Sequence, residues 1–176
     1  NSMMTKNIKE IGSFIIVVGK TSGHLYQSEF YKEVVGIKDG PPPDVNLFNE
    51  KNNGLLIQKL IPFIDKSKKG SIIITSSSVG QKPRENWGAY SISKYAMEGV
   101  STMLSLELKS KNIIVNTVNP GGTATSMRRQ AMPDEDQSKI PQPSDILPIF
   151  LYLSSNEAYE TGQSFNARDY IGLLNF

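Results

Sequence analysis

Short apolar runs alternate along the chain with longer segments that have helical spacing. Runs rich in β-branched residues occur at 11–18, 71–75 and 113–118, each bounded by glycine or polar turn residues. Such runs are typical of strands buried on both faces of a parallel sheet. We therefore predict strands at these three places, and a last short strand at 163–167.

Between the strands lie segments whose apolar residues recur every three or four positions. Residues 47–65 and 88–111 show this spacing, which predicts amphipathic helices. In the second helix we expect a buried face made of Ile92, Ala96, Val100, Met103, Leu104 and Leu108. Ser144 and Asp145 give an N-cap signal before another apolar run, with Pro148 in its first turn. Alternating strands and helices predict a doubly wound α/β fold.

Composition excludes several classes of function. A chain of 176 residues without Cys cannot form disulfide scaffolds, Cys-ligated zinc sites, iron–sulfur clusters or thiol nucleophiles. The single His, His24, argues against a His-rich metal site, so we expect no metal. A net charge of +2 gives no reason to expect a nucleic-acid partner.

The apolar runs are too short for a membrane span. Residues 14–18 form the first long run, whereas a membrane helix needs about 20 residues. No stretch has the basic, apolar and small-residue order of a signal peptide. With no Cys and no such signal, we expect a cytoplasmic protein without a membrane partner.

Tyr90 and Lys94 lie four positions apart at the start of a predicted helix, which places both on one face. An ammonium group beside a phenol lowers the pKa of the phenol from its usual value of about 10. Such a tyrosine can act as a general acid or base near neutral pH. The spacing alone is weak evidence, because it often occurs by chance between two surface residues of a helix.

Two further segments are expected at the same edge of the sheet. Ser77 follows the strand at 71–75 and precedes Tyr90 by thirteen positions. The strand at 113–118 runs into the loop 119–125, with the sequence NPGGTAT. Ligands of open parallel sheets bind at the carboxyl ends of the strands. The order of the segments therefore predicts a site that Ser77, Tyr90 and this loop share.

Four stretches resemble the short-chain dehydrogenase/reductase family: GSIIITSSSVG at 70–80, NWGAYSISKYAMEG at 86–99, NIIVNTVNPGGTATSM at 112–127, and the segment 143–165. They cover most of residues 47–167 in the order and spacing of that family. The resemblance implies a Rossmann-like fold. It also implies an oxidoreductase that uses NAD or NADP to interconvert the carbonyl and alcohol forms of a small molecule.

The resemblance also implies catalytic roles. Tyr90 would exchange the proton with the substrate oxygen, Lys94 would lower the pKa of Tyr90 and bind the nicotinamide ribose, and Ser77 would hydrogen-bond the substrate oxygen. Asn49 fits the position of an asparagine that holds a water in a proton relay. Other asparagines compete for this role, and a solvated surface is an alternative for all of them: Asn46, Asn52 and Asn53.

Cofactor binding would involve the turn after the first strand, the catalytic helix and the loop after the third strand. The matching residues are Gly19, Ser22, Gly23, Tyr90, Lys94, Pro120, Gly121, Thr123 and Thr125. The turn departs from the family pattern, because Val18 replaces a threonine and Leu25 replaces the last glycine. The residue that separates NAD from NADP is absent, so the preference stays open.

The first half of the chain is short for this family. Only thirty positions separate Gly19 from Asn49, and a βαβ unit needs roughly 30 residues. We expect one domain over 1–176, with a catalytic half at 47–176 and a remnant of the dinucleotide-binding half at 1–46. Either the sequence joins separate segments of a longer chain, which we favour, or the chain is truly shortened.

Several alternatives accompany this hypothesis. A shortened chain would be a scaffold or interaction protein without normal dinucleotide binding. A hydrolase needs a Gly-x-Ser-x-Gly elbow and a suitable histidine. Ser77 lies in the sequence SSSVG, which is not such an elbow, and His24 is the only histidine.

Arg128 and Arg129 fall in the family's substrate lid, where they would meet an anionic substrate or water. The resemblance also suggests a homodimer or homotetramer built through the helices at 47–65 and 88–111.

Overall fold

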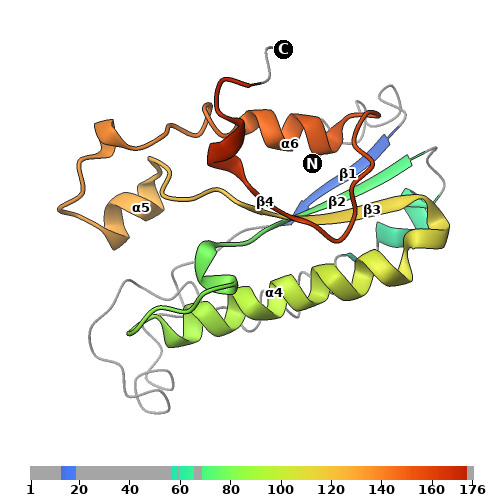
Figure 1. Cartoon of the computed structure of the whole chain (residues 1–176), viewed down its shortest axis with the longest axis horizontal. Coiled ribbons are helices and arrows are strands. Elements are labelled where there is room, and N and C mark those ends of the chain that lie inside the picture. The colour runs from blue at the N-terminus through green and yellow to red at the C-terminus, as the bar shows by residue number, and fades with distance from the viewer. Residues whose placement is uncertain (1–12, 19–56, 59, 66–68, 174–176) are drawn as a thin grey trace.

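A computed structural model describes residues 13–18, 57–58, 60–65 and 69–173. Its sheet has four parallel strands in the order β1-β2-β3-β4 (Figure 1). Their bounds are Ser13–Val18, Lys69–Thr75, Ile113–Asn119 and Ser164–Asn166. The four predicted strands are thus confirmed to within a few residues at their ends.

The register of the strands brings their carboxyl ends to one edge. Val18 pairs with Ile74, Ile74 pairs with Thr117, and Thr117 pairs with Ser164. Figure 1 shows the short helix α5 (Ser126–Ala131) beyond this edge. The loops that follow β2, β3 and β4 therefore begin side by side, as the parallel order predicts.

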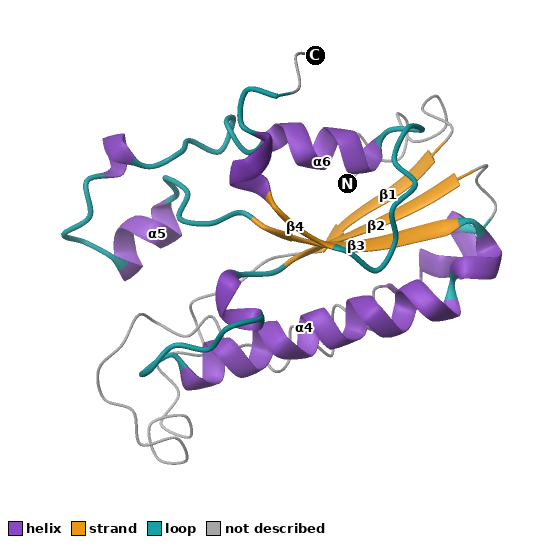
Figure 2. Ribbon diagram, viewed as in Figure 1, coloured by secondary structure: helices purple, strands orange, loops and turns teal. Residues whose placement is uncertain are grey.

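Helices cover both faces of the sheet (Figure 2). α4 (Gly88–Glu107) lies along one face and α6 (Leu147–Ser154) along the other. Short 3-10 turns named η1 to η4 lie at Ser78–Gly80, Lys109–Lys111, Gln137–Lys139 and Ala167–Tyr170. None of the described helices is long and apolar enough to cross a membrane. The doubly wound α/β fold is confirmed.

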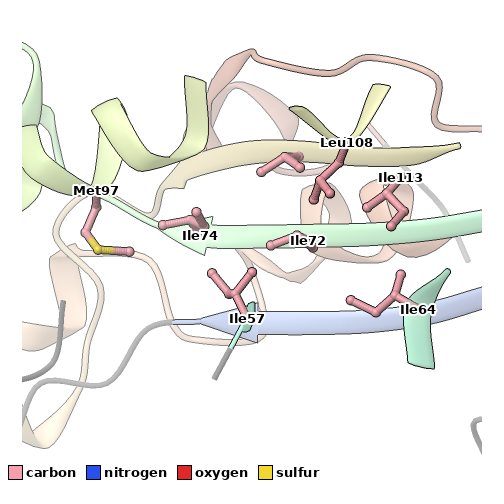
Figure 3. Close-up of a cluster of buried hydrophobic side chains, with 8 residues drawn as sticks. Ile57, Ile64, Ile72, Ile74, Met97, Leu108 and Ile113 are labelled. Atoms are coloured by element: carbon pink, nitrogen blue, oxygen red, sulfur yellow. The ribbon is translucent and has the colours of Figure 1, made fainter. Parts of the chain in front are cut away.

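Alternate residues of β2 supply the two halves of the core, because successive side chains of a strand point to opposite faces. Ile72 and Ile74 lie in one cluster with Met97 of α4 (Figure 3). Ile73 lies in the other cluster with Leu153 of α6. The central strand is thus apolar on both sides, which explains its unbroken isoleucine run.

The predicted buried face of α4 is partly wrong. Ile92 is 64% exposed and Met103 is 59% exposed, so both point away from the sheet. Serines fill much of the buried face instead: Ser91, Ser93, Ser101 and Ser105. The hydroxyl of Ser105 donates to the carbonyl of Thr102 at 2.7 Å, which satisfies it inside the interface. A pattern of apolar residues alone cannot reveal a face built from small polar ones.

The predicted N-cap of α6 is also wrong. The N-cap is Ile146, and Ser144 and Asp145 lie in the turn before it. The carboxylate of Asp145 accepts from the backbone N–H of Gln142 at 2.7 Å. Asp145 therefore closes that turn and does not cap the helix. Pro148 does lie in the first turn of α6, as expected.

Replacing Leu153 with alanine should lower the free energy of unfolding by about 2–5 kcal/mol, since its side chain is fully buried in the core. The control is Leu151→Ala on the same helix, where the side chain is 46% exposed. We expect that control to cost less than about 1 kcal/mol. Urea denaturation of both variants measures the difference, and equal losses would contradict the assigned core.

Candidate active site

The first turns of α4 hold the tyrosine and lysine that the sequence pairs. The Lys94 side chain is 8% exposed, and its Nζ donates to the carbonyl of Thr75 at 3.2 Å. The same Nζ lies 5.6 Å from the centroid of the Tyr90 ring. Because Thr75 ends β2, this hydrogen bond fixes the ammonium group at the carboxyl edge of the sheet, next to the phenol.

Ser77 lies in the segment that leaves β2 and is half-buried. Its carbonyl accepts from the N–H of Gly80 at 2.9 Å, which closes the turn η1. η1 packs closely on α4: a Cβ at Gly80 would lie 2.9 Å from the Cβ, C and O atoms of Lys94. A glycine at position 80 therefore lets this turn and the helix approach at the lysine.

The loop after β3 is held by its own hydrogen bonds. Asn119 Oδ1 accepts from the N–H of Gly121 at 3.0 Å, and Gly121 has a φ of +69°, which glycine adopts without strain. The Thr123 hydroxyl donates to the carbonyl of Pro120 at 3.2 Å. Thr125 caps α5, because its hydroxyl oxygen accepts from a backbone N–H at 3.1 Å. The hydroxyl of Thr123 thus stabilises the loop, and that of Thr125 stabilises the start of α5.

These segments surround one cavity of about 730 Å³. Its wall includes seven of the residues named from the sequence: Ser77, Tyr90, Lys94, Pro120, Gly121, Thr123 and Thr125. The remaining ones, Gly19, Ser22, Gly23 and Asn49, lie outside the described residues. The structure therefore brings together the catalytic helix, the serine turn and the loop after β3.

An aromatic side chain forms another part of the wall. Trp87 meets Tyr90 edge to face, with ring centroids 5.7 Å apart and an interplanar angle of 66°. The guanidinium carbon of Arg84 lies 5.7 Å from the centroid of the Trp87 ring. Trp87 therefore lines the cavity and also packs against the candidate acid/base, so it holds that ring in place.

The cavity wall also contains an ion pair between α5 and the segment that follows it. Arg128 binds Glu135 through Nε and Nη2, with both N–O distances at 2.6 Å. The hydrogen bond from Arg128 lowers the pKa of Glu135. The bond to Glu135 raises the pKa of Arg128, and the charge of Tyr90 adds to that rise. Arg128 and Tyr90 both line the cavity, whereas Arg129 is exposed and outside the cavity wall.

Sequence reasoning missed Arg168, which also lines the cavity. It lies in η4, directly after β4, and its Nη2 donates to the carbonyl of Gly122 at 2.8 Å. Its position directly after a parallel strand could have indicated this role, since ligands bind at the carboxyl ends of such strands. The strand has only three residues and no motif marks the arginine, so the signal was easily overlooked.

The cavity residues fit the nicotinamide end of a dinucleotide, the cofactor that the family resemblance implies. The hydroxyl of Ser76 lines the cavity, is 2% exposed, and has no hydrogen-bond partner among the described residues. Buried polar groups are rarely left unpaired, so this hydroxyl is suited to a polar ligand. Carbonyl, hydroxyl and ammonium groups of the same wall match a ribose and a carboxamide.

The chain matches known proteins over most of its length. The family model described as short chain dehydrogenase matches residues 48–136. The uncharacterized oxidoreductase YciK of Escherichia coli K12 is 37% identical over 169 residues, which are 93% of this chain and 67% of YciK. A shorter match, 53% identical over 60 residues, links 34% of the chain to 8% of the phosphoribosylformylglycinamidine synthase subunit PurL of Pelagibacter ubique.

Solved structures share the fold. A short chain dehydrogenase from Shigella flexneri 2a, complexed with NADP, has a TM-score of 0.69 and 32% identity. The match covers 94% of this chain and 68% of that one. About a third of YciK and of the Shigella protein thus has no counterpart here. The family model and the match to YciK together show that the chain belongs to the short-chain dehydrogenase family of oxidoreductases.

Proposed function

We propose that the chain is an NAD(P)-dependent oxidoreductase that interconverts a carbonyl and an alcohol, with Tyr90 as the general acid and base. One observation carries this proposal: Lys94 is fixed by the Thr75 carbonyl beside the Tyr90 ring, in the wall of the cavity that Ser77 shares. The NADP complex of the Shigella relative supports the choice of cofactor.

The chain's own residues would bind the substrate oxygen and transfer the proton. Ser77 donates a hydrogen bond to the carbonyl oxygen and so stabilises the negative charge that develops there. Tyr90 gives its proton to that oxygen in reduction and takes it back in oxidation. The ammonium of Lys94 favours the phenolate form in between. A bound nicotinamide cofactor supplies or accepts the hydride. Asn49 would hold the relay water, and this role remains a proposal.

Cofactor contacts are proposed for two parts of the chain. Lys94 and the loop after β3 would hold the nicotinamide end, through Pro120, Gly121, Thr123 and Thr125. Gly19, Ser22 and Gly23 would meet the diphosphate. Their turn follows Val18, which pairs with Ile74 at the ligand edge, and this pairing supports the assignment. Residues 1–46 would then be the dinucleotide-binding remnant and 47–176 the catalytic half.

Self-association is proposed on the exposed apolar side of α4. Four large apolar side chains on that helix are exposed: Ile92, Tyr95, Met103 and Leu106. Single exposed apolar residues are ordinary, but several along one helix mark a contact surface. A second copy of the chain would cover them, which supports a homodimer or homotetramer.

The proposed function is tested by titrating the protein with NADH and NADPH and following the fluorescence of Trp87, the only tryptophan. Because Trp87 lines the cavity, a bound nicotinamide should quench it. Addition of carbonyl compounds should then consume the reduced cofactor and yield an equal amount of alcohol. The relative affinities give the cofactor preference. Absence of binding by both cofactors would contradict the proposal and favour a non-catalytic scaffold.

A further inference from the structure

Two arginines from distant segments meet over the backbone of Gly122. Arg128 Nη2 and Arg168 Nη2 each lie 3.3 Å from the point where a Cβ of Gly122 would stand. Arg128 comes from α5 and Arg168 from η4, and both line the cavity. Two guanidinium groups beside the same glycine repel each other, which favours negative charge nearby.

Charge in the cavity wall is strongly unbalanced. The wall has four cationic side chains and one carboxylate: Arg84, Lys94, Arg128, Arg168 and Glu135. Both oxygens of Glu135 already bind Arg128, although the charge of Arg168 also contributes to the lowered pKa of Glu135. The single carboxylate can neutralise only one of the two neighbouring guanidinium groups, so one positive charge remains that an anionic ligand can neutralise.

Arg168 has donors to offer such a ligand. A guanidinium group has five N–H donors, and the only hydrogen bond found for Arg168 among the described residues is the one from Nη2 to Gly122. The residue is exposed, so an incoming oxyanion need not break any contact to reach it. The hydrogen bond to Gly122 fixes the position of the group and lowers the entropy cost of binding.

We infer that the substrate carries a carboxylate or an equivalent oxyanion, which Arg168 binds together with Arg128 while the reacting carbonyl lies at Tyr90. Arg128, Arg168 and Tyr90 line the same cavity of about 730 Å³, so the two ends of one small molecule can occupy it together. This inference rests on the proposed oxidoreductase function. It adds the substrate class, an anionic carbonyl or hydroxy compound.

A matched pair of substrates tests the inference: 4-carboxybenzaldehyde and its neutral methyl ester, each with the preferred reduced cofactor. We expect kcat/KM to be at least about tenfold higher for the acid, since a charge-assisted hydrogen bond contributes on that scale. In Arg168→Gln the KM for the acid should rise about tenfold, while KM for the ester and for the cofactor stays the same. Added salt should raise KM for the acid more than KM for the neutral ester.

The control variant is Arg129→Gln, because Arg129 is an exposed arginine of the same helix α5 outside the cavity wall. It should leave the preference for the acid unchanged. Binding is followed without turnover by the quenching of Trp87 fluorescence with benzoate. Arg168→Gln should weaken benzoate binding about tenfold, and Arg129→Gln should not affect it.

Each outcome decides a different point. Equal use of acid and ester, with no effect of Arg168→Gln, overturns the inference and leaves the proposed function intact. Benzoate binding that needs Arg168, without reduction of any carbonyl compound, supports the anion site and contradicts the proposed function. A rise in KM for the cofactor alone assigns Arg168 to a cofactor phosphate and overturns the inference. Absence of benzoate binding to the parent protein overturns it as well.

Discussion

Replacing Tyr90 with phenylalanine should lower kcat/KM for carbonyl reduction by about 10³-fold, because proton transfer by a positioned side chain contributes roughly 10²–10⁴-fold. The substitution removes only the hydroxyl. The ring can keep its edge contact with Trp87 and its place beside the Lys94 ammonium. Fold stability and cofactor affinity should therefore stay close to those of the parent protein.

The control for this variant is Tyr95→Phe in the same helix. Tyr95 is exposed, and its hydroxyl donates to the carbonyl of Gln81, away from the cavity wall. We expect activity within about twofold of the parent, since surface substitutions of this kind have small effects. Steady-state kinetics and the Trp87 titration separate catalysis from cofactor binding. Full activity in Tyr90→Phe would refute the role assigned to this phenol.

The candidate site could be predicted largely because its parts are set by local rules. Helical spacing places Tyr90 and Lys94 on one face, and the parallel order of strands brings Ser77 and the loop after β3 to one edge. Both rules hold in the structure, where Lys94 contacts Thr75 at the end of β2. Asn49 and the turn at 19–23 lie outside the described residues, so their assignment stays a prediction.

What the sequence did not reveal depends on contacts between distant segments. Arg168 meets Arg128 only because β4 pairs with β3 and so brings η4 next to the loop. The buried face of α4 contains serines, and the hydroxyls of Ser93 and Ser105 donate to carbonyls of the preceding helical turn. A hydrophobic pattern treats serine as polar and therefore assigned Ile92 and Met103 to the wrong side.

Gly80 illustrates how such a distant contact positions the catalytic lysine. A Cβ there would stand 2.9 Å from three atoms of Lys94, namely C, O and Cβ, none of which is the end of a flexible side chain. The Gly80→Ala variant must therefore move η1 or α4. Overpacking of this kind costs about 1–3 kcal/mol of unfolding free energy.

A shift of α4 would displace both Lys94 and Tyr90 from the cavity wall. We expect Gly80→Ala to lower kcat about 10²-fold, since a displacement of about 1 Å can have that effect on a catalytic group. The control is Gly99→Ala in α4, where a Cβ would meet no atom of the described residues within 4 Å beyond the neighbouring backbone of the helix. That variant should keep its activity, and its free energy of unfolding should rise by about 0.5–1 kcal/mol, because alanine has a higher helix propensity than glycine.

Urea denaturation and steady-state kinetics of the two alanine variants test this argument together. The close approach at Gly80 predicts that Gly80→Ala loses both stability and kcat. Gly99→Ala should lose neither. A Gly80→Ala protein as stable and active as Gly99→Ala would show that η1 and α4 tolerate a methyl group between them. The packing of this turn would then not position Lys94, and the hydrogen bond to Thr75 alone would hold the ammonium group in place.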